Sequence, residues 1–156
     1  MNIFSNMFWI YIKKYSFAKN NQFMNSNEEK MSLLSEMIAF AVIDGELHDR
    51  EYDFLLMVSQ ELQVDKETFL KLFERRNEIK VIKDEFHRIL HFYRLALLMH
   101  CDGVLHEHER IAINEIGINM GLNPNAMKRV LHLMEQSPDQ MVEGDVLLGA
   151  FQEQLN

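Results

Sequence analysis

The sequence has few of the residues that interrupt or cross-link a chain. It contains two prolines, six glycines and one cysteine in 156 residues. Folds built from short strands need a turn about every eight to twelve residues, so this supply of proline and glycine is too small for them. A single cysteine excludes an internal disulfide and favours a reducing compartment, so we expect a cytoplasmic protein.

Positive charge and long apolar runs are also scarce. The 16 lysines and arginines are outnumbered by 24 aspartates and glutamates, which gives a formal net charge of -8. Without an excess of positive charge, the chain lacks the attraction that supplies most nucleic-acid affinity, so we expect no nucleic-acid partner. The same balance favours cationic partners, metal ions among them. No apolar run reaches the roughly 18 residues typical of a transmembrane helix, so we expect no membrane partner.

What the chain does contain is a helical hydrophobic period that begins near Ser26. Apolar residues recur at three- and four-residue spacing, and no segment alternates at period two. The predicted helices are one that ends at Asp44-Gly45, one that ends near Gln63, one capped by Asp65, a long one from about Asp84 to Cys101, one from about Glu107 to Met120, one that begins at Asn123-Pro124, and a last segment that reaches Leu155. The sequence therefore predicts a single compact all-α domain of about seven helices.

Residues 1–23 differ from the remainder of the chain. They carry Lys13, Lys14 and Lys19 but no acidic residue. These lysines follow a short apolar stretch rather than precede it, which is the wrong order for a secretory signal. We therefore divide the chain into an N-terminal extension (1–23) and a helical domain (24–156). The extension is an added helix, an interfacial anchor, or a segment upstream of a true start at Met24.

A short motif occurs twice in the helical domain. DGELHDRE, which ends at Glu51, and DGVLHEHE, which ends at Glu109, agree at five of eight positions. Each copy follows an apolar helix and precedes an amphipathic one. We interpret them as two pseudo-symmetric helix–DG turn–helix repeats.

One interpretation of the motif is purely structural. Gly45 and Gly103 can adopt positive φ, which lets the chain leave one helix and begin the next within a few residues. Glu51 and Glu109 follow the histidine of their copy by three residues, which is the spacing of a capping box. In this interpretation both turns only cap helices, and the domain serves as a helical protein-interaction module.

The other interpretation is a cation site at which the two turns meet. Hard divalent cations require several converging carboxylate oxygens, and imidazole ligands admit transition metals as well. The candidate metal ligands are Asp44, Glu51, Asp102 and Glu109, with His48 and His106 as further donors. Calcium, manganese and zinc are all compatible with this set of ligands.

Two further interpretations of the motif, an EF-hand loop and a hydrolytic metalloenzyme, have less support in the sequence. A functional EF-hand loop would place Phe40 and Val42 at its first and third positions, where carboxylates are required. A hydrolytic metalloenzyme would use the same histidines and carboxylates, but no HExxH motif, phosphate loop or nucleophile elbow is present.

These motifs resemble the TerB-like family, the tellurite-resistance module that is also related to the N-terminal region of the DjlA co-chaperone. The resemblance lies in IAFAVIDGELHDRE and LALLMHCDGVLHEHE, in which an apolar helix runs into a DG turn and a glutamate begins the next helix. It implies a compact fold of about seven helices, no enzymatic activity, and a role in metal- or tellurite-related stress with a divalent cation or a protein partner. His48 and His106 depart from the family pattern, in which Ser or Thr caps are commoner.

Three further residues are candidate metal ligands or nucleophiles. Cys101 aligns with the apolar Ile43 in the repeat, so we expect a small buried thiol. His87 and His91 are four residues apart on one helical face, a spacing that can chelate a metal. Because no third ligand is fixed by the sequence, we expect these histidines to lie on a solvated face.

Overall fold

The computed structural model describes residues 26–43, 45–74, 81–101 and 106–153. Within these ranges the chain forms seven helices and no strand, so the predicted all-α class is confirmed. The helices are α2 (Asn27–Ala41), α3 (Asp49–Glu61), α4 (Lys66–Lys71), α5 (Glu85–His100), α6 (Glu107–Asn119), α7 (Pro124–Gln136) and α8 (Gly144–Gln152). The N-terminal extension, 1–23, lies outside the described residues.

The predicted helix starts are confirmed by their capping hydrogen bonds. Ser26 Oγ accepts from the N–H of Glu29, and Asp65 Oδ1 accepts from the N–H of Thr68. Asn123 caps α7, with proline at the first turn. Each of these side chains satisfies a backbone donor that the helix itself leaves without an acceptor. The predicted boundaries therefore have a local chemical cause.

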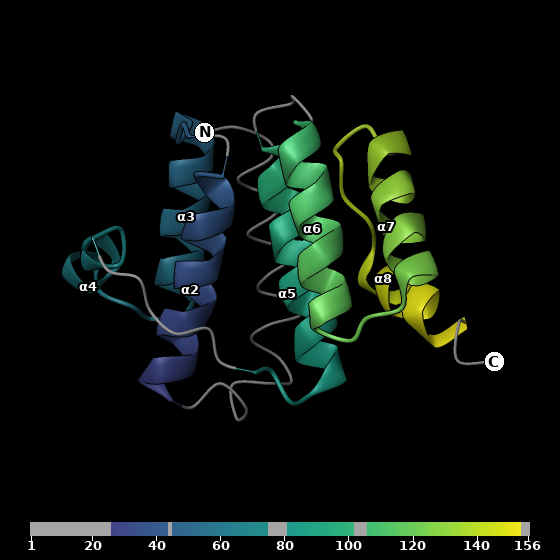
Figure 1. Ribbon diagram of the computed structural model, residues 1–156, viewed down its shortest axis with the longest axis horizontal. Helices are drawn as coiled ribbons and strands as arrows, with labels where there is room; N and C mark the ends of the chain where they lie inside the picture. Colours follow the sequence, from purple (N-terminus) through teal and green to yellow (C-terminus); the bar gives the residue numbers. More distant parts are fainter. Residues whose placement is uncertain (1–25, 44, 75–80, 102–105, 154–156) are drawn as a thin grey trace.

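The helices pack in neighbouring pairs around a central one. Helix α5 contacts α2, α3 and α6, while α7 packs between α6 and α8. Figure 1 shows α2 and α3 on one side, α5 and α6 in the centre, and α7 and α8 on the other side. The short helix α4 lies beyond α3, which it contacts.

Helix α5 forms the middle of the core. Every residue from His91 to His100 is buried, as expected of a helix that is surrounded by others. The run includes the charged or titratable side chains of His91, Arg94 and His100. The expectation that His91 lies on a solvated face is wrong, because its side chain is fully buried. Cys101 is buried, as predicted.

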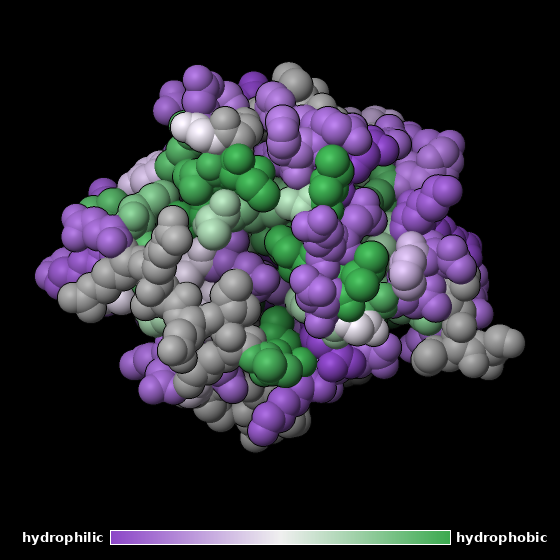
Figure 2. All heavy atoms as spheres, in the orientation of Figure 1, coloured by the Kyte–Doolittle hydropathy of each residue, from purple (hydrophilic) through white to green (hydrophobic). Residues whose placement is uncertain are grey.

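The outer surface is mixed. Figure 2 shows a face on which apolar residues form separate groups among hydrophilic ones. The large apolar side chains that remain exposed in the described residues are Val42, Ile43, Leu70, Val81, Ile111, Ile118 and Val146. None of the described helices is long and apolar enough to cross a bilayer.

Candidate functional site

The repeated motifs supply the first residues of α3 and α6. His48 occupies the N-cap of α3, and His106 occupies the N-cap of α6. Before α3 the chain turns at Gly45, whose φ of 92° is the predicted positive value. A residue with a Cβ rarely adopts this conformation, so glycine is required for the short connection.

The two N-caps lie beside each other. The imidazole rings of His48 and His106 have centroids 6.2 Å apart and planes only 8° from parallel. Both side chains are half-buried, so neither is sealed from solvent. The fold therefore places the start of α3 next to the start of α6, which is the juxtaposition that a shared site requires.

Glu51 lies inside this junction. Its side chain is 2% exposed, and its Oε2 accepts a hydrogen bond of 2.9 Å from the N–H of His48. This is the glutamate half of the predicted capping box, and it is confirmed. An ordinary capping glutamate gains this hydrogen bond at the protein surface, whereas Glu51 gains it in a buried position.

Glu109 has the equivalent place in α6. It is the third residue after His106 and is 1% exposed. Moving a carboxylate out of water is costly unless charge or hydrogen bonds compensate it, so two such residues at neighbouring helix starts need a physical reason. The positive end of each helix dipole supplies part of it, because both glutamates lie in a first turn.

Two of the predicted ligands, Asp44 and Asp102, lie outside the described residues, as does the predicted turn glycine Gly103. Among the residues that are described, no three His, Cys, Asp or Glu side chains converge closely enough to hold a metal ion. The structure therefore brings the two histidines together and places each glutamate in the first turn of its helix, while a metal site at this junction stays a prediction.

Buried contacts between polar side chains beside α5 could not be predicted from the repeated motifs. His91 Nε2 lies 2.7 Å from Glu36 Oε2, and the guanidinium of Arg94 lies 3.9 Å from Glu61. These contacts join α5 to α2 and to α3. The sequence does place His91 and Arg94 inside an otherwise apolar run. An ionisable side chain in such a run needs a partner, so this position was a sign that each contact exists.

Comparison with protein-family models, with curated proteins and with solved structures finds no match to this chain.

Proposed function

We propose that the protein is a non-enzymatic, cytoplasmic TerB-like module that binds a divalent cation where α3 and α6 begin. The observation that carries the proposal is the pair of buried glutamates, Glu51 and Glu109, at helix starts whose N-cap histidines adjoin. Asp44 and Asp102 precede these helices in the repeated motif and would add two carboxylates. A role in metal- or tellurite-related stress follows from the family resemblance.

The types of side chain at the proposed site limit which ions it could bind. Carboxylate oxygens suit calcium and manganese, while the half-buried imidazoles of His48 and His106 would also suit zinc. If the imidazoles are ligands, replacing both histidines by Ala weakens zinc binding much more than calcium binding. This comparison separates an all-oxygen site from a mixed site.

Thermal unfolding of chelator-treated protein tests the proposal. Calcium, manganese or zinc should raise the Tm, because a ligand that binds only the folded state stabilises it by mass action. Asp44→Ala together with Asp102→Ala should abolish the rise, whereas Glu115→Gln, an exposed change on α6, should leave it intact. A Tm that none of the three ions alters contradicts the proposal.

A second function is favoured by the hydrogen bond that Glu51 makes. Because Glu51 already accepts a hydrogen bond from the N–H of His48, it can serve to cap α3 without any bound metal. In this alternative the protein is a helical interaction domain for a protein partner. Glu51→Gln then has almost no effect on any property, since glutamine also serves a capping box. In the metal-binding module the same variant folds normally and loses the ion-dependent rise in Tm.

A further inference from the structure

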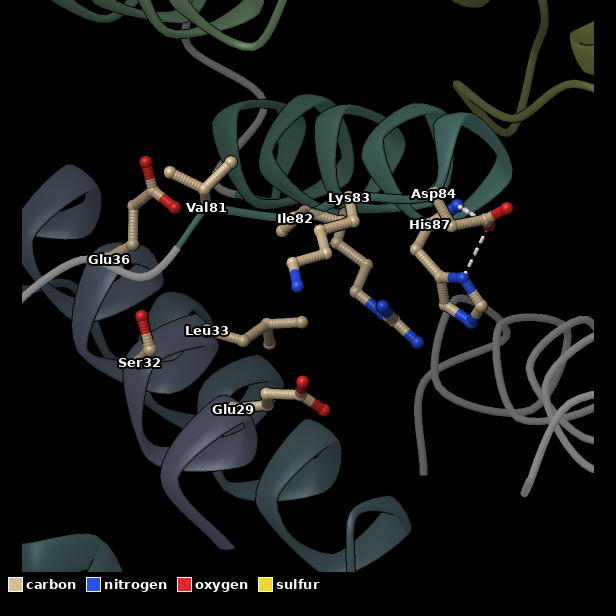
Figure 3. A pocket seen from close by; sticks show the side chains of 10 residues that line it. Glu29, Ser32, Leu33, Glu36, Val81, Ile82, Lys83, Asp84 and His87 are labelled. Atoms are coloured by element: carbon tan, nitrogen blue, oxygen red, sulfur yellow. Dashed lines mark hydrogen bonds and ion pairs between the residues drawn. The ribbon is translucent and has the colours of Figure 1, made fainter. Parts of the chain in front are cut away.

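A second candidate site lies away from the repeated motifs. A cavity of about 260 Å³ opens between α2 and the first turn of α5, beside the segment 81–84. Figure 3 shows side chains from both elements converging on it. None of its lining residues belongs to either DG motif. Its volume lies just below the range of sites for drug-sized molecules, so it suits a small ligand.

Most charged groups in the lining already have partners. Glu36 lies 2.7 Å from His91, Asp84 lies 2.6 Å from His87, and Arg94 lies 3.9 Å from Glu61. These side chains already have polar partners within the protein, so they are less available to a ligand than a side chain without one.

Two opposite charges in the lining remain available. In the part of the chain that the structure describes, Glu29 and Lys83 form no ion pair, either with each other or with a third side chain. Figure 3 shows them on opposite walls, Glu29 on α2 and Lys83 on the segment before α5, with Leu33 between them. Both residues are exposed, so solvent and ligands reach them.

We propose that this cavity binds a free aliphatic amino acid in its zwitterionic form. Lys83 would bind the carboxylate and Glu29 the ammonium group. The aliphatic side chains of Leu33, Val81 and Ile82 offer an apolar surface for the ligand's own side chain. Glu29 would repel a ligand with only negative charge, and Lys83 would repel one with only positive charge. Only a ligand that carries both charges can therefore pair with both walls of the cavity.

Isothermal titration calorimetry with L-leucine tests this proposal on the full chain. L-leucine should bind saturably in the micromolar to millimolar range. N-acetyl-L-leucine, which lacks the ammonium group, and L-leucinamide, which lacks the carboxylate, should each bind about twofold to fivefold more weakly. Saturable binding of either derivative with the affinity of L-leucine overturns the proposal, as does the absence of L-leucine binding at millimolar concentration.

Charge-removing variants assign the two walls. Glu29→Gln and Lys83→Gln should each weaken L-leucine binding about twofold to fivefold. Their matched controls, Glu115→Gln on α6 and Lys128→Gln on α7, remove exposed charges elsewhere and should leave the affinity unchanged. If Glu29→Gln and Lys83→Gln bind L-leucine as the controls do, the proposal fails. A chelator should not alter L-leucine binding, so this result is independent of the proposed metal site.

Discussion

The imidazole rings of His48 and His106 lie 6.2 Å apart and within 8° of parallel, although the two residues are far apart in the sequence. Each histidine occupies the N-cap position of the helix in which the buried glutamate of its motif lies. This contact places the start of α3 beside the start of α6.

The first prediction concerns the capping hydrogen bond of Glu51. Glu51→Ala removes the acceptor for the N–H of His48 and should lower the free energy of unfolding by about 1 kcal/mol in metal-free protein. Glu51→Gln retains an acceptor oxygen and should lose only a few tenths of this amount, about 0.3 kcal/mol. Urea unfolding of the two variants measures the difference. Equal losses would show that the carboxylate charge, rather than the hydrogen bond, stabilises the turn.

The second prediction compares two glycines within helices. A Cβ at Gly117 would overlap the sulfur of Met127 and approach Phe92, whereas a Cβ at Gly149 would meet no atom within 4 Å. Gly117→Ala should destabilise the protein by about 1–3 kcal/mol, because overpacking outweighs the gain in helix propensity. Gly149→Ala should stabilise it by up to about 1 kcal/mol. Thermal unfolding checks both signs, and a stabilising Gly117→Ala would contradict the packing of α6 on α7.

The third prediction concerns Tyr93. Its buried hydroxyl donates to the carbonyl of Val142 at 3.3 Å and accepts from the N–H of Val142 at 3.1 Å, which ties α5 to the segment before α8. Tyr93→Phe leaves both backbone groups of Val142 without this partner and should cost about 1–3 kcal/mol. Denaturant unfolding measures the loss. A change within about 0.5 kcal/mol, as is usual for surface substitutions, would contradict the assigned role.

The raised pKa of Tyr93 also predicts that the folded protein loses stability at alkaline pH. Burial raises its pKa to about 12, so the folded state retains the phenolic proton that the unfolded chain releases near pH 10. Stability should therefore fall as the pH rises from about 10 to about 12. Tyr93→Phe should remove this part of the pH dependence. If wild type and variant lose stability in parallel over this window, the assignment is wrong.

The fourth prediction concerns Asp84, the N-cap of α5. Its hydrogen bond from the N–H of His87 lowers the pKa of the carboxyl below its usual value of about 3.9. The stabilisation is present above that value and is lost as the pH falls through the lower pKa of the folded state. Asp84→Ala should cost about 1 kcal/mol at neutral pH. The difference from wild type should shrink below about pH 4, and a difference that stays constant would exclude the charge as its source.

The fold could be predicted from the sequence because its signals are local. The cap at Asp65, the Asn123-Pro124 start of α7 and the positive φ at Gly45 each depend on residues within a few positions of one another. The hydrophobic period of 3.6 then identifies the buried face of each helix.

The candidate site could be predicted only in part, because it depends on contacts between distant segments. The repeat indicated equivalent roles for His48 and His106, but only the packing of the helices shows that the two rings adjoin. The burial of His91 against Glu36 was not predicted, because the partner lies 55 residues away on another helix. The spacing of apolar residues along a helix predicts which of its faces is buried. It does not predict which other helix covers that face.

Isothermal titration calorimetry of chelator-treated protein with calcium, manganese and zinc measures metal binding directly. We expect a single saturable site for at least one of these ions. The double variant Glu51→Gln, Glu109→Gln, which keeps the side-chain shapes and removes both buried charges, should abolish the binding heat. Glu115→Gln should retain it. If wild-type protein gives no saturable heat with any of the three ions, the junction of α3 and α6 is a capping structure and not a metal site.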